Sequence, residues 1–251
     1  MLKNTLIIAH RGASGSAPEN TLSAFVKAVE AGADMIELDV HQTKDGVVVC
    51  IHDEYLSRTT SGNGKVNKFT FNELQNFDAG IKFNEKFKGE KIPSLEEVLE
   101  QIKLPLLIEI KKGEGYYHGI ENKIFELLKK YDLKNQCVIQ SFESSVLEKF
   151  RKLGGGIELH KLVTGNIPII PLHIDNKLKT GSITKYSKFP AINPNYRFIS
   201  KKLVNKLHNE GKKIFTWTVN NESDMIKMVQ YGVDGIITNY PEQLVKILQN
   251  Q

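Results

Sequence analysis

Cysteine is scarce in this sequence, with only Cys50 and Cys137 among 251 residues. Both lie inside runs of β-branched apolar residues, "VVVCIH" and "CVIQS", where a cysteine usually behaves as a small buried hydrophobe. We therefore expect no disulfide framework.

Long apolar runs are also missing. The chain passes from Met1 directly into a short apolar segment, with neither an extended hydrophobic stretch nor a cleavage site after it. This pattern predicts no secretory signal, no stable insertion into a membrane and a cytoplasmic location.

A strong charge of either sign is absent as well. Lysine and arginine total 34 against 29 aspartates and glutamates, a surplus too small and too scattered to predict binding of nucleic acid. Positive charge is denser in residues 65–91 and 177–188, which form either a solvated face or the rim of a site for an anionic substrate. The sequence gives no prediction of the oligomeric state.

Short β-rich runs alternate with helical segments along almost the whole chain. The eight predicted strands are residues 5–10, 35–40, 47–52, 106–110, 137–141, 157–163, 213–219 and 235–239. The intervening segments carry helix signals, such as the capping box of Ser94 and Glu97. At about 250 residues, this alternation predicts one α/β domain over 1–251, a (β/α)8 barrel of the TIM type. A doubly wound open sheet is the alternative.

The link at 41–46 is too short for a helix. The predicted strands on either side of it form either a hairpin across Asp45 and Gly46 or two barrel strands joined by an extended return. In a hairpin, we expect Asp39 to lie opposite His52.

A second irregular region, residues 53–91, follows the third predicted strand. It is rich in Phe, Asn, Lys and Gly, and one short helix is predicted from Thr70, where Glu73 completes a capping box. A segment of this length after a strand is typical of a lid, so we expect an inserted cap.

Paired charged residues mark the ends of two predicted strands. Glu37 and Asp39 are two residues apart, which places both side chains on one face of a strand, and Glu109 and Lys111 repeat this spacing. Adjacent carboxylates in a barrel interior are costly unless a cation compensates them, so the pattern indicates a site for Mg²⁺ or Ca²⁺. An outward polar stripe and a structural salt bridge are the alternatives.

Two histidines, His10 and His52, also end predicted strands. A lone histidine there is more often structural, but two at one rim fit a general acid and a general base. Gly12 allows the chain to turn sharply, and Arg11 presents a fork of donors suited to a phosphate.

With these residues in place, the chain resembles the glycerophosphodiester phosphodiesterase family. The matching segments, in the family's order, are "AHRGASGSAPENTLSAF" (9–25), "GADMIELDVHQTKDGVVVCIHD" (32–53), "IPSLEEVL" (92–99), "IEIK" (108–111), "QSF" (140–142), "WTVN" (217–220) and "GVDGIITNYP" (232–241). The resemblance implies a (β/α)8 barrel with a small insertion after the third strand. It also implies hydrolysis of glycerophosphodiesters, such as glycerophosphocholine or glycerophosphoethanolamine, to glycerol 3-phosphate and an alcohol.

The resemblance carries roles over by position. It implies that His10 and His52 are the acid and base pair and that Arg11 and Lys111 contact the phosphate. It also implies that Mg²⁺ or Ca²⁺ is held by Glu37, Asp39 and Glu109. Trp217 and Phe142 are expected either to form a wall against the substrate or to belong to the core. Which histidine is the acid, and whether water or a substrate hydroxyl attacks, stays open.

Three rival functions remain. An aldolase-like barrel would need Lys111 as a neutral amine for a Schiff base, which the neighbouring carboxylates disfavour. A non-catalytic binding barrel would lack one of the two histidines. A lysophospholipid-cleaving enzyme would need an apolar rim facing a membrane, which the insert at 53–91 leaves open.

Overall fold

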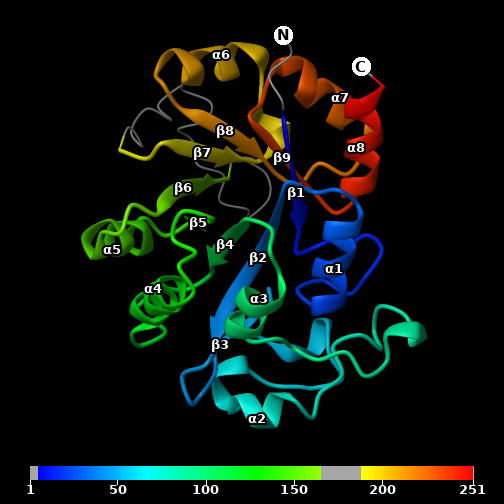
Figure 1. Ribbon diagram of the computed structural model, residues 1–251, viewed down its shortest axis with the longest axis vertical. Coiled ribbons are helices and arrows are strands. Elements are labelled where there is room, and N and C mark those ends of the chain that lie inside the picture. Colours follow the sequence, from blue (N-terminus) through cyan, green and yellow to red (C-terminus); the bar gives the residue numbers. More distant parts are fainter. Residues whose placement is uncertain (1–4, 165–187, 251) are drawn as a thin grey trace, which may run out of the picture.

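The computed structural model of the protein describes residues 5–164 and 188–250. Eight strands in it form a closed parallel barrel, in the order β1, β2, β4, β5, β6, β7, β8, β9 and back to β1. Helices surround these strands, as Figure 1 shows. The predicted TIM-type (β/α)8 barrel is therefore confirmed.

The barrel strands are short and buried. Their bounds are β1 Leu6–His10, β2 Met35–Gln42, β4 Leu106–Ile110, β5 Cys137–Ser141, β6 Glu158–Val163, β7 Ala191–Pro194, β8 Lys213–Thr216 and β9 Gly235–Thr238. The main helices are α1 Leu22–Glu30, α3 Leu95–Gln101, α4 Ile120–Lys130, α5 Ser144–Leu153, α6 Lys201–Asn209, α7 Glu222–Tyr231 and α8 Pro241–Gln249. Both boundaries of β4 and β5 agree with the prediction.

Seven of the eight predicted strands belong to the barrel. Of the two alternatives for the link at 41–46, the hairpin is confirmed, because the run at 47–52 forms β3, Val48–Cys50, which pairs antiparallel with β2 outside the barrel. The eighth barrel strand is instead β7, which was not predicted. Its four residues, "AINP", include an asparagine and a proline, and neither favours a strand.

The register of the β2–β3 hairpin also differs from the prediction. Val40 pairs with Cys50, and the amide of Ile51 donates to the carbonyl of Asp39 over 3.0 Å. Ile51, and not His52, therefore lies opposite Asp39. The predicted register was wrong by one residue. The backbone hydrogen bond between Thr43 and Val47 closes a turn with Gly46 in a left-handed conformation, at a φ of 88°.

Residues 53–91 fold into short elements beyond the end of β2, drawn in cyan in Figure 1. They comprise α2, Phe71–Leu74, and the 3₁₀ turns Leu56–Arg58, Val66–Lys68 and Glu85–Phe87. Thr70 and Glu73 form the predicted capping box at the start of α2. Apolar residues of the segment pack with residues of the hairpin and with Ile92 in a small separate cluster, made of Val49, Ile51, Leu56, Val66, Leu74, Ala79 and Ile92.

The interior of the barrel has an apolar layer beneath a polar one. Because alternate residues of a strand share a face, the inward residue two positions further along each strand lies one layer closer to the C-terminal rim. The lower layer includes Ile8, Leu107, Val138, Ala191, Phe215 and Ile237. Two residues beyond them come His10, Glu109, Gln140, Asn193, Trp217 and Asn239. The fold thereby gathers side chains capable of chemistry at one mouth.

Cys50 and Cys137 are both buried and free. Burial raises the pKa of the Cys137 thiol to about 12, so both behave as the small hydrophobes that were predicted. Of the lysine-rich stretch 177–188, all but Lys188 lies outside the described residues. Within the described part of the chain, no helix is both long enough and apolar enough to cross a bilayer.

Candidate active site

Three carboxylates converge at the C-terminal mouth of the barrel. Glu37 and Asp39 both point inward from β2, and Glu109 on the neighbouring β4 pairs in register with Asp39. One oxygen of each lies within 4.8 Å of the others, and all three side chains are buried. The expected acidic trio is therefore assembled by the pairing of two adjacent strands.

Two cations lie against this trio. The Lys111 ammonium is 2.9 Å from Oδ1 of Asp39 and 2.7 Å from Oε1 of Glu109. Nε of Arg11 is 3.2 Å from Oδ2 of Asp39, and the Arg11 backbone N–H donates to Glu37 over 3.0 Å. Asp39 is thus the carboxylate that both cations share.

The turn that presents Arg11 depends on glycine. Arg11 and Gly12 both have positive φ, 56° and 79°, as the chain bends from β1 toward α1. A Cβ on Gly12 would lie 2.6 Å from the backbone carbon of Ala24, so only glycine fits there. The predicted function of Gly12 in the turn agrees with this geometry.

The two cations of the site do not favour the ionised form of all three carboxylates. Burial would raise the pKa of Asp39, but Lys111 and Arg11 hold it well below its usual range. Burial, followed by the charge of Asp39, raises the pKa of Glu37 well above its usual value, and burial also raises that of Glu109. Three buried carboxylates face two cations, so the cluster has the donors and the charge to hold a divalent metal ion.

The two predicted histidines lie in the same pocket as these groups. His10 Nδ1 is 2.6 Å from Oδ1 of Asn239, and His52 Nδ1 is 2.5 Å from Oδ1 of Asp53. Because an amide or carboxylate oxygen can only accept, each Nδ1 carries the proton and each Nε2 is left as the reactive nitrogen. Burial lowers the pKa of His10 to about 3 and also lowers that of His52, which favours the neutral form of each ring.

A pocket of about 110 Å³ joins these groups to an apolar wall. Both histidines line it together with Arg11, Glu37, Glu109 and Lys111, and its apolar lining includes Phe142, Leu162 and Trp217. Phe142 and Trp217 meet edge to face with ring centroids 5.7 Å apart, and Phe142 is 42% exposed. The structure therefore brings every predicted site residue to one cavity, apart from Asp39, which is buried in contact with Arg11 and Lys111 of its lining.

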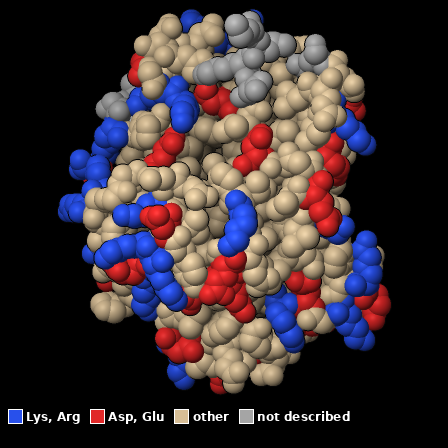
Figure 2. Space-filling view, viewed as in Figure 1, with Lys and Arg blue, Asp and Glu red and all other residues tan. Residues whose placement is uncertain are grey.

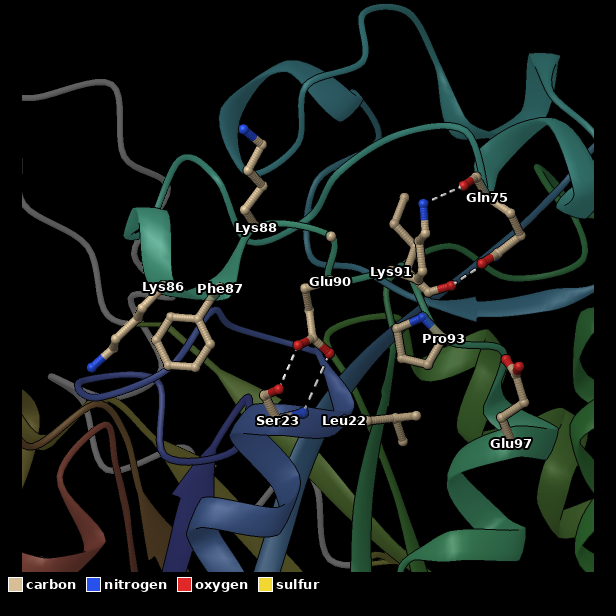
Figure 3. Close-up of a pocket in the computed structure, with 12 residues that line it drawn as sticks. Leu22, Ser23, Gln75, Lys86, Phe87, Lys88, Glu90, Lys91, Pro93 and Glu97 are labelled. Atoms are coloured by element: carbon tan, nitrogen blue, oxygen red, sulfur yellow. Dashed lines mark hydrogen bonds between the residues drawn. The ribbon is translucent and has the colours of Figure 1, made fainter.

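A larger pocket of about 390 Å³ lies elsewhere, between the start of α1 and residues 86–93. In Figure 3, the carboxylate of Glu90 reaches Ser23 at the first turn of α1, and Lys86, Lys88 and Lys91 also line the pocket. His10 and His52 do not line it, and neither do Glu37, Asp39 and Glu109, so we place the candidate active site at the smaller pocket. Over the face drawn in Figure 2, positive and negative side chains are intermixed.

Several residues that hold the site in place were not predicted from the sequence. Asn239 orients His10, Asn20 donates to Asp39 over 2.9 Å, and Gln140 donates to Glu37 over 3.2 Å. Asn239 and Gln140 lie at strand ends, as the predicted site residues do, and this position in the sequence could have indicated that they belong to the site. His41 was also missed; its Nε2 lies 3.0 Å from the His52 carbonyl.

Comparison with known proteins agrees with this geometry. The model of the glycerophosphoryl diester phosphodiesterase family matches residues 10–243. A glycerophosphodiester phosphodiesterase of Caldanaerobacter subterraneus subsp. tengcongensis is 42% identical over 248 residues, and the match covers 98% of each chain. One of Bacillus altitudinis is 39% identical over 249 residues, and the match covers 97% of this chain and 98% of the other. The solved structure of an Oleispira antarctica phosphodiesterase in complex with the product sn-glycerol-3-phosphate has a TM-score of 0.86 at 29% identity, covering 97% of this chain and 96% of the other. The chain therefore belongs to the glycerophosphoryl diester phosphodiesterase family of enzymes.

Proposed function

We propose that this chain hydrolyses glycerophosphodiesters, such as glycerophosphocholine or glycerophosphoethanolamine, to glycerol 3-phosphate and an alcohol. The reaction depends on a divalent metal ion, Mg²⁺ or Ca²⁺, held by Glu37, Asp39 and Glu109. The observation that carries the proposal is the convergence of two imidazoles, three buried carboxylates and two cations on one pocket. The product named in the Oleispira antarctica complex supports the choice of substrate class.

The phosphate is held by the cations of the site. Arg11 and Lys111 line the pocket and supply positive charge against the non-bridging oxygens of the phosphodiester. A bound divalent cation would add charge stabilisation of the same kind. Lys111 stays charged because Asp39 and Glu109 raise its pKa against the effect of burial, which also disfavours the rival Schiff-base function.

The two histidines divide the proton transfers between them. Nε2 of one neutral ring accepts the proton of the attacking hydroxyl. The other ring, protonated on both nitrogens, donates its Nε2 proton to the leaving alkoxide. The partner of His52 is the carboxylate of Asp53, which favours a charged ring, whereas the partner of His10 is a neutral amide. We therefore assign His52 as the acid and His10 as the base.

Phe142 and Trp217 line the pocket together with the charged groups and contact each other edge to face. We propose that these two rings form a wall that contacts the carbon atoms of the substrate. We also propose that residues 1–251 form one catalytic domain, in which 53–91 act as an inserted cap. Contacts of Arg58 with Glu19 and of Glu90 with Ser23 support the second point, because both join the insert to the barrel.

A single set of assays tests the reaction. The purified chain receives glycerophosphocholine with Mg²⁺ or Ca²⁺, with and without EDTA, and release of glycerol 3-phosphate is measured. We expect release that requires the metal and that is lost in His10→Ala and His52→Ala with the fold intact. Release insensitive to EDTA would contradict the metal site, and near-normal rates in either variant would contradict the proton transfers.

The assignment of acid and base has its own test. A substrate whose leaving group is nitrophenolate needs no protonation at that oxygen. We expect His52→Ala to regain much of the lost rate on such a substrate and His10→Ala to regain little. The reverse pattern would exchange the two assignments.

A further inference from the structure

Arg58 connects two parts of the site that lie on different loops. It belongs to the first 3₁₀ turn of the 53–91 insert, Leu56–Arg58. Its Nε and Nη2 donate to the two oxygens of Asp53 over 2.5 and 3.2 Å, and its Nη1 and Nη2 donate to those of Glu19 over 2.8 and 2.7 Å. One guanidinium therefore holds two carboxylates, each through both of its oxygens.

Each of these carboxylates also binds a site residue. Oδ1 of Asp53, which accepts from Arg58, is the atom that accepts from His52 Nδ1. Oε1 of Glu19, which also accepts from Arg58, accepts from Nη1 of Arg11 over 2.9 Å. A continuous chain of contacts thus runs from the imidazole of His52, through Arg58, to the guanidinium of Arg11.

An arginine suits the position of residue 58 between two carboxylates, and lysines elsewhere in the insert do not bridge carboxylates in this way. A planar guanidinium can bind two carboxylates side by side, whereas an ammonium offers a single point charge. Lys88, for comparison, is 68% exposed and meets only Glu85 at 3.4 Å. Arg58 is 45% exposed, so solvent reaches it although its partners lead into the pocket.

We propose that Arg58 is a positioning residue for hydrolysis, which fixes the ring of His52 through Asp53 and the side chain of Arg11 through Glu19. The proposal rests on the proposed function. It makes the insert a structural part of the active site, because ordering of the first 3₁₀ turn sets the orientation of a proton-transfer group and of a phosphate contact together.

The first test removes the guanidinium. We expect Arg58→Ala to lower kcat/KM roughly 10-fold to 100-fold, a loss of the size seen when outer-shell partners of metal ligands are removed. Arg58→Lys should recover only part of it, because one ammonium cannot hold both carboxylates. Lys88→Ala, which removes one positive charge from the same insert, should behave as the unmodified chain.

Chemical rescue separates positioning from a merely structural effect. Guanidinium ions at millimolar concentration should restore part of the rate to Arg58→Ala, and the same concentration of sodium chloride should not. The two contacts of Arg58 should also have different kinetic effects. Asp53→Asn should mainly lower kcat, and Glu19→Gln should mainly raise KM. Unchanged kinetics in Arg58→Ala would overturn the proposal, as would a loss that guanidinium does not restore in a variant with unchanged thermal unfolding.

A binding measurement distinguishes failure of this proposal from failure of the proposed function. Calorimetry with glycerol 3-phosphate should show Kd raised about tenfold in Arg58→Ala through Arg11, and unchanged in Lys88→Ala. An unmodified chain without turnover would overturn the proposed function, while equal Kd values for it and Arg58→Ala would overturn the positioning of Arg11.

Discussion

Replacing Lys111 by methionine tests the electrostatics of the site separately from turnover. The ammonium lies 2.9 Å from Asp39 and 2.7 Å from Glu109 and is only 16% exposed. At an effective dielectric constant of about 20, each contact contributes about 6 kcal/mol of attraction, and desolvation of the ions offsets much of that. Removing one partner of a buried pair leaves uncompensated charge, which costs about 3 to 5 kcal/mol.

We therefore expect Lys111→Met to lower the free energy of unfolding by about 3 to 5 kcal/mol in EDTA. Mg²⁺ or Ca²⁺ should restore part of the loss, because a cation bound only by the folded state stabilises it. The assay is urea unfolding followed by the fluorescence of Trp217, the single tryptophan. Lys112→Met, at an exposed neighbouring position, is the control. A loss below about 1 kcal/mol, the range of a surface salt bridge, would refute this reasoning.

Three further predictions concern the surroundings of the site. Burial would raise the pKa of Asp53, but hydrogen bonds from Arg58 and the adjacent imidazole lower it to about 2. The ionised Asp53 therefore stabilises the folded state above its unfolded pKa of about 3.9, and this stabilisation is lost as the pH falls through 2. Asp53→Asn should lower the free energy of unfolding by about 1 kcal/mol at pH 7 and leave it unchanged below pH ~2. A difference in unfolding free energy that stays constant across that range would contradict this. Glu90→Ala removes the acceptor for Ser23 at the start of α1 and should cost about 1 kcal/mol, with faster amide exchange in the insert; unchanged exchange would argue against this contact. Phe142→Ala should raise KM for glycerophosphocholine roughly 3-fold to 10-fold through loss of contact with the quaternary ammonium, and should affect a diester of an uncharged alcohol less; equal effects on both would exclude that contact.

The barrel could be predicted because its signals are local. Apolar runs such as 106–110 and 137–141, followed by capped helices, indicate strands wherever they occur, and their number indicates closure. The missed strand Ala191–Pro194 is held by pairing with β6 and β8, so its tertiary neighbours decide its conformation and its own residues do not.

The acidic trio could be predicted for a similar reason. Residue spacing fixes that Glu37 and Asp39 share a face, and parallel strands bring their C-terminal ends to one rim. Register does not follow from spacing, which is why Asp39 was expected opposite His52 and lies opposite Ile51. The contact of Arg58 with Glu19 depends on how an irregular insert packs against a loop 39 residues earlier in the chain, and no periodic pattern in either segment encodes that contact.

The most direct measurement of the central claim is release of glycerol 3-phosphate from a glycerophosphodiester by the purified chain, with metal supplied and then chelated. The account predicts release that stops on chelation, resumes when Mg²⁺ or Ca²⁺ is returned, and is absent from Asp39→Asn. Sustained release by Asp39→Asn, or by the native chain in EDTA, would contradict it.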